Sequence, residues 1–148
     1  MSARFLWGAA VFAALLLAIQ LVPVERSNPA IEADVPATPE ARALLKRACY
    51  DCHSNEVVWP WYAHVAPVSW LVARDVREGR KAVNYSTWNR LSAGDRRDAL
   101  DESWEEVEDG DMPLWFYVPL HPEARLGAED RRVLRDWSRS ARRTGEGE

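Results

Sequence analysis

The stretch Cys49-Tyr50-Asp51-Cys52-His53 constrains this chain more than any other, and it contains the only two cysteines. A histidine follows the second cysteine directly. This spacing is typical of covalent attachment of a c-type haem, in which two thiols add to the haem vinyl groups and the adjacent imidazole binds iron. We therefore predict one haem c per chain, attached at Cys49 and Cys52, with His53 as an iron ligand.

Two other chemistries use closely spaced cysteines. A thioredoxin-type redox pair requires a preceding strand and a βαβ context, whereas residues 39–46 have a helical pattern. A structural zinc site requires two further ligands, and the remaining histidines, His64 and His121, lack the close pairing usual in zinc fingers. Both alternatives therefore fit the sequence less well than haem.

The second informative stretch surrounds Met112, the only methionine besides the initiator. Met112 follows a glycine-containing break and precedes Pro113, so we expect a loop to fix its position. A thioether opposite His53 would complete six-coordinate iron. The alternative is that Met112 only fills a gap in the core. His121 and His64 are the rival candidates for the sixth ligand.

Tryptophan is unusually frequent, with eight residues in the chain. A core lined with large flat rings suits a planar cofactor, although a small helical protein can also fill its interior with tryptophan. We expect the loop Trp59-Pro60-Trp61-Tyr62 to wrap one edge of the haem. Trp59, Trp61 and Trp70 are therefore the predicted cofactor-binding aromatics.

The N-terminal residues 1–26 contain a long apolar run from Phe5 to Val24. As a helix this run would be about 30 Å long, enough to cross a bilayer. We predict an uncleaved transmembrane anchor; a cleaved signal peptide is the alternative. Because Arg4 precedes the run, the remainder should lie outside the cytoplasm, where haem c is attached.

Residues 27–37 contain prolines and small residues without helical or strand periodicity, which indicates a linker. One domain should follow over residues 38–143. Thr38 can cap its first helix and Ser92 a later one, and Gly79 is the predicted end of a helix. Residues 144–148 should be disordered. We expect helices over residues 39–49, 67–79, 92–109 and 128–142, and hence a mainly α fold. The net charge of −4, without a basic face, argues against nucleic acid.

Six blocks of the sequence form a recognisable combination: the N-terminal anchor, Cys49–Asn55, Trp59–Tyr62, Ala66–Leu71, Met112-Pro113 and His121–Ala124. Together they resemble the bacterial haem-binding domain family, whose members are small proteins similar to c-type cytochromes. The resemblance covers roughly residues 38–140 and implies covalent haem with His53 as the proximal ligand. The Met112-Pro113 element also resembles the distal loop of class I cytochromes c, although the family commonly has a second proline where this chain has Leu114.

These observations predict a membrane-anchored monohaem cytochrome that passes single electrons to redox partner proteins on the periplasmic side of the inner membrane. The alternative is a haem-based sensor or haem-delivery protein with a labile sixth ligand. The sequence contains no nucleophile–base pair or glycine-rich phosphate loop, so we expect no enzymatic activity. A peroxidase would need an open iron position and a distal acid or base, for which only His64 or His121 could be suggested.

Overall fold

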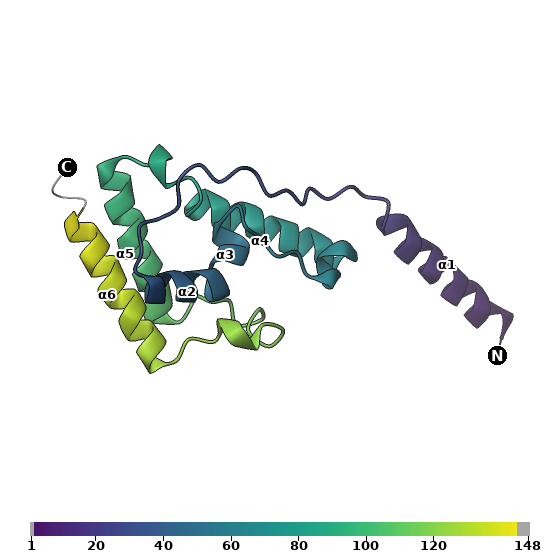
Figure 1. The fold of residues 1–148 in the computed structure, drawn as a ribbon. Coiled ribbons are helices and arrows are strands. Elements are labelled where there is room, and N and C mark those ends of the chain that lie inside the picture. Colours follow the sequence, from purple (N-terminus) through teal and green to yellow (C-terminus); the bar gives the residue numbers. More distant parts are fainter. Residues whose placement is uncertain (1, 145–148) are drawn as a thin grey trace.

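The computed structural model describes residues 2–144, and every named secondary-structure element in this part of the chain is helical (Figure 1). The prediction of a mainly α fold is confirmed. The helices are α1 (Ala3–Ile19), α2 (Pro39–Ala48), α3 (Tyr50–His53), α4 (Val68–Ala82), α5 (Ala93–Asp109) and α6 (Ala128–Thr144), with short 3₁₀ turns η1 (Trp61–His64), η2 (Trp88–Arg90) and η3 (Pro122–Ala124).

The core lies where α5 and α6 pack side by side and α2 crosses α6. Tyr85 is at its centre, because its ring contacts those of Tyr50, Trp88 and Trp137 at centroid distances of 5.7, 6.5 and 6.4 Å. All four rings are buried. Trp88 and Trp137 therefore pack in the interior, in the same core cluster as Tyr50 of the cysteine motif.

Two helix starts agree with the sequence because their hydrogen bonds are local. The Thr38 side chain accepts from Ala41 N at 3.2 Å and begins α2. Ser92 and Asp95 form a reciprocal capping box at the start of α5. At the other end of α5, Gly110 adopts φ 85°, a conformation that glycine accepts without strain.

The predicted helix end at Gly79 is wrong, because α4 continues to Ala82. Gly79 instead lies where α4 crosses α3. A Cβ at this position would lie 2.7 Å from the backbone oxygen of Cys52. The glycine therefore permits close packing against the cysteine motif and does not end the helix.

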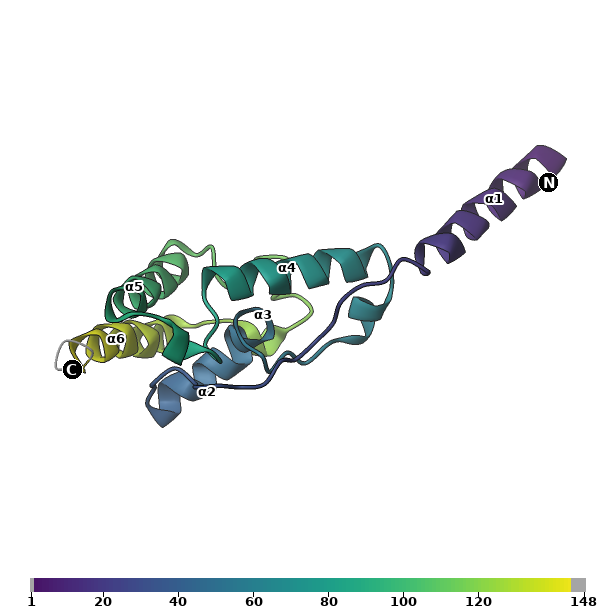
Figure 2. The same ribbon diagram turned by 90° about the horizontal axis from the view of Figure 1, so that it is seen from above.

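The N-terminal apolar segment forms a shorter helix than predicted. α1 ends at Ile19, and its 17 residues are about 26 Å long. The Gln20 side chain donates to Leu16 O and Ala66 O at 3.0 and 3.1 Å and accepts from Ala66 N at 2.9 Å. Among the described residues no helix is long and apolar enough to cross a membrane, so the predicted transmembrane helix is not present in the structure. Figures 1 and 2 show α1 projecting from the other helices.

The predicted linker, residues 27–37, is extended, and it also packs against the domain. Asn28 Nδ2 donates to Val57 O at 2.9 Å, and Trp137 Nε1 donates to Pro36 O at 2.8 Å. Val35 is fully buried. The domain therefore begins before residue 38. The predicted disordered tail, 144–148, lies outside the described residues except Thr144, the last residue of α6.

Candidate cofactor site

The cysteine motif spans a break between two short helices. Cys49 has φ −125° and ψ −37°, which separates α2 from α3. Its carbonyl oxygen accepts from Cys52 N and His53 N at 3.1 and 2.9 Å, so one tight turn joins the three predicted haem-binding residues. The next residue, Ser54, is fully buried and donates to Tyr50 O at 2.7 Å.

Two adjoining cavities flank this motif. One, of about 260 Å³, lies between α3, α4 and the loop after α5; the other, of about 210 Å³, lies between the motif and α5. Neither alone reaches the roughly 300 Å³ typical of a small-molecule pocket. They adjoin because they share five lining residues, and together they provide a larger space. The shared residues are Ala48, Cys49, His53, Ala82 and Met112.

Both cysteines are free thiols, and burial raises the pKa of each from 9.0 to about 12. A redox-active Cys-x-x-Cys pair has a lowered pKa instead, because the thiolate is the nucleophile. In addition, the described residues contain no group of three or more metal-binding side chains that could hold an ion. The raised pKa of both thiols does not match a redox-active pair.

His53 is oriented by the end of α4. Its Nδ1 lies 3.2 Å from Val83 O, an acceptor that favours the proton on Nδ1. Burial lowers the pKa of His53, against the opposing effect of hydrogen bonds to the Val83 and Gly79 backbone. The neutral imidazole with Nε2 unprotonated is the form that binds iron.

Met112 is the only one of the three candidate distal ligands that lines both cavities. Its backbone N donates to Glu106 O at 2.9 Å, just after Gly110 has ended α5. His64 is exposed in η1. His121 is buried, but it lines neither cavity, and its Nε2 lies 3.1 Å from the Tyr62 hydroxyl. The geometry therefore favours Met112 as the partner of His53.

Tyr117 and Asp51 are site residues that the sequence did not reveal. The Tyr117 hydroxyl donates to Asp51 Oδ2 at 2.7 Å, which ties the Met112 loop to the motif. Asp51 Oδ1 also accepts from Val58 N at 3.0 Å. Burial, followed by the bond to Asp51, raises the pKa of Tyr117. The Tyr117 ring also contacts the His121 ring, at a centroid distance of 3.9 Å and an interplanar angle of 31°. His121 Nδ1 is buried without a partner among the described residues.

The helical walls of the cavities also have a sequence signal, but a weak one. Asp75, Glu78, Gly79 and Ala82 recur at helical spacing along α4. Ala99, Glu102, Ser103 and Glu106 do the same along α5. In both stripes small side chains leave space beside the motif. Carboxylates accompany them, and burial raises the pKa of Asp75.

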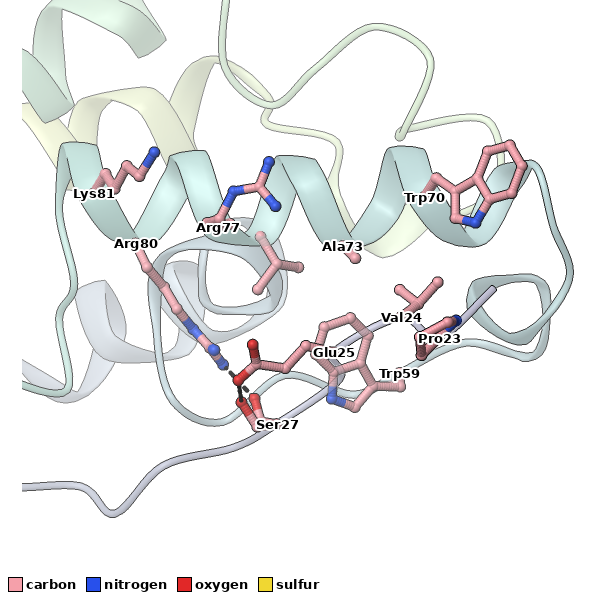
Figure 3. Close-up of a pocket in the computed structure, with 11 residues that line it drawn as sticks. Pro23, Val24, Glu25, Ser27, Trp59, Trp70, Ala73, Arg77, Arg80 and Lys81 are labelled. Carbon is pink, nitrogen blue, oxygen red and sulfur yellow. Dashed lines mark hydrogen bonds between the residues drawn. The ribbon is translucent and has the colours of Figure 1, made fainter. Parts of the chain in front are cut away.

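The three predicted aromatic residues do not gather at this site. Trp59 and Trp70 line a different cavity, of about 490 Å³, between α4 and residues 23–27 (Figure 3). Trp61 is 78% exposed and packs edge-on against Tyr62. None of the three lines the cavities beside the cysteines. The prediction that they bind the cofactor is therefore not supported by their positions.

The site contains two thiols, an oriented imidazole and a thioether around a partly apolar space. This arrangement is that of a small helical protein that binds a cofactor. Comparison with known families matches residues 14–140 to the haem-binding domain family, and the chain belongs to it. Haem is accordingly the cofactor, and the donor set fits it. No curated protein and no solved structure matches the chain.

Proposed function

We propose that the protein is a monohaem c-type cytochrome that carries single electrons. Cys49 and Cys52 would hold the haem covalently, and His53 and Met112 would bind its iron. Iron with a thioether and an imidazole ligand supplies a one-electron couple of raised potential. The residues around it would exclude water and keep both ligands in place.

The observation that carries this proposal is the joint position of His53 and Met112 on the walls of both cavities. They come from elements 59 residues apart in the chain, so only the fold brings them together. A space lined by an oriented imidazole and a thioether matches the requirements of His/Met ligation.

Optical and electron paramagnetic resonance spectra of the purified haem-loaded chain test the ligands. We expect low-spin iron in the wild type and high-spin iron in Met112→Ala. Leu114→Ala is the matched control, because Leu114 lies in the same loop and lines one of the same cavities but cannot bind iron. His121→Gln should also remain low-spin. Five-coordinate iron in the wild type would instead indicate the sensor or delivery function.

Covalent attachment has its own test. After expression with a haem-attachment apparatus, the denatured wild-type chain should have a mass increased by one haem. Cys49→Ala with Cys52→Ala should release haem on denaturation. A wild-type chain with only its peptide mass would refute the covalent bond but not haem binding.

We also propose that the N-terminal segment attaches the protein to the inner membrane, with the haem domain on the periplasmic side. The support is the apolar character of α1, in which no residue is buried against the domain, together with the extracytoplasmic location of haem c attachment. Redox partner proteins would then meet the domain at the membrane surface. Flotation with neutral phosphatidylcholine vesicles tests the attachment, and removal of residues 2–19 should abolish it.

A further inference from the structure

Trp59 and Trp70 line a third cavity, which the cytochrome function does not use. It lies between α4 and residues 23–27 (Figure 3), and its volume of about 490 Å³ is within the usual range for a small-molecule site. Cys49, Cys52, His53 and Met112 do not line it.

The charges of this cavity suit an anion. Arg77, Arg80 and Lys81 project from α4, and Glu25 is the only carboxylate among the lining residues. Arg80 is already fixed, because it donates to Ser54 O at 2.8 Å and to Ser27 O at 3.0 Å. Arg77 and Lys81 instead make exposed pairs with Glu78, at 3.2 and 3.1 Å. Exposed pairs of this kind are weak, so both side chains can exchange Glu78 for an anionic ligand.

The position of the cavity identifies the source of that anion. Two hydrogen bonds between the Gln20 side chain and the Ala66 backbone fix the end of α1 against the domain. Arg26 also donates to Ala63 O at 3.2 Å. The cavity therefore lies beside the end of an exposed apolar helix. η1, the turn after it and the start of α4 also have exposed apolar side chains, namely Trp61, Val65, Val68 and Leu71.

Tryptophan beside basic residues at the end of an apolar helix is the arrangement that favours the headgroup region of a membrane. We infer that the cavity binds one anionic phospholipid, with its phosphate against Arg77 and Lys81, its glycerol region between Trp59 and Trp70, and its acyl chains beside α1. The inference rests on the proposed membrane attachment. It adds a specific lipid site that would hold the haem domain close to the bilayer.

Native mass spectrometry of the full haem-loaded chain in neutral detergent tests this site. The probes are short-chain phosphatidylglycerol, phosphatidylcholine with the same chains, and glycerol phosphate. We expect one phosphatidylglycerol to be retained per chain, with about tenfold less of each other probe. Arg77→Gln with Lys81→Gln should reduce retention of phosphatidylglycerol about tenfold.

The matched control is Lys46→Gln with Arg132→Gln, which removes the same charge from two other exposed ion pairs. It should retain the lipid as the wild type does. Equal retention of both phospholipids would overturn the inference. Unchanged retention of phosphatidylglycerol by the Arg77→Gln and Lys81→Gln double variant would also overturn it. Equal retention of glycerol phosphate would indicate a soluble phosphate ester and would also overturn it. Haem spectra of the same samples and flotation with neutral vesicles report separately on the proposed function.

Discussion

Asp51 is one of the two variable residues in the Cys-x-x-Cys-His motif, yet it has a specific role in the structure. Its carboxylate accepts from Val58 N and from the Tyr117 hydroxyl, at 3.0 and 2.7 Å. Because Tyr117 is five residues beyond Met112, this bond joins the loop of the proposed distal ligand to the proximal motif. One phenol therefore links the two sides of the haem site.

Tyr117→Phe should loosen this loop. Loss of a hydrogen bond to a carboxylate costs about 1–2 kcal/mol of unfolding free energy, and Met112 should leave the iron at a lower urea concentration. Tyr62→Phe is the control, because Tyr62 bonds His121 rather than the motif. Urea titrations followed by the haem spectrum measure both effects. Identical ligand loss in the two variants would show that the bond to Asp51 does not position Met112.

The two thiols should be unreactive in the folded, haem-free chain. Burial raises the pKa of Cys49 and of Cys52 from 9.0 to about 12, so the protonated form dominates at pH 8. Three pKa units reduce the thiolate fraction by about a thousandfold. Alkylation by iodoacetamide at pH 8 should therefore be at least about a hundredfold slower than in urea, as mass spectrometry can follow.

The same shift has a consequence for stability. Because the folded pKa exceeds the unfolded value of 9.0, the thiols contribute their full stabilisation below pH 9 and lose it as the pH rises toward about 12. The haem-free Cys49→Ala and Cys52→Ala double variant should lack this alkaline loss in urea unfolding. Equal alkaline loss in the wild type and the variant would exclude the thiols as its cause.

At the scale of elements, the contact between α3 and α4 depends on Gly79. Alanine would gain up to about 1 kcal/mol in helix propensity, but its Cβ would lie 2.7 Å from Cys52 O. Such overpacking typically costs about 1–3 kcal/mol, so Gly79→Ala should have a lower free energy of unfolding.

The control for this contact is Gly94→Ala near the start of α5. Its added Cβ would lie 3.7 Å from Ser92 Oγ, an ordinary contact distance. Its free energy of unfolding should be unchanged or slightly higher. Urea unfolding measures both variants. An undiminished free energy of unfolding in Gly79→Ala would show that α4 can move away from the motif without cost.

Residues 27–37 also belong to the folded domain. A chain beginning at residue 38 would leave Trp137 Nε1 without Pro36 O and would uncover the core contacts of Val35. We expect this chain to lose cooperative thermal unfolding, whereas a chain beginning at residue 25 should keep it. Circular dichroism melts of the two haem-loaded chains compare them. Similar melting of both would restore the linker interpretation.

Features set by local hydrogen bonds could be predicted from the sequence. Features set by contacts between distant residues could not. The caps at Thr38 and Ser92 could be predicted because their hydrogen bonds span three residues. The role of Gly79 could not be predicted, since the glycine allows close packing against Cys52, 27 residues away. Likewise, Trp59 and Trp70 are close in sequence to the motif, but they face residues 23–27 instead.

At the scale of the whole molecule, the attachment of α1 to the domain determines how the protein would lie on a membrane. The Gln20 side chain donates to Ala66 O and accepts from Ala66 N. The connection between α1 and the domain is therefore fixed and not a flexible linker. Val65 is 45% exposed beside this junction. In contrast, α6 lies at the opposite end of the molecule from α1 (Figures 1 and 2).

This arrangement predicts a fixed orientation in vesicles. With Cys49 and Cys52 occupied by haem, Val65→Cys and Arg139→Cys can each carry one nitroxide label. The label at residue 65 should contact lipid-soluble oxygen, and the label at residue 139 should contact only aqueous relaxation agents, as power saturation can measure. Because a flexible tether would average the two environments, equal aqueous access at both positions would show that the hydrogen bonds of Gln20 do not hold the domain against the bilayer.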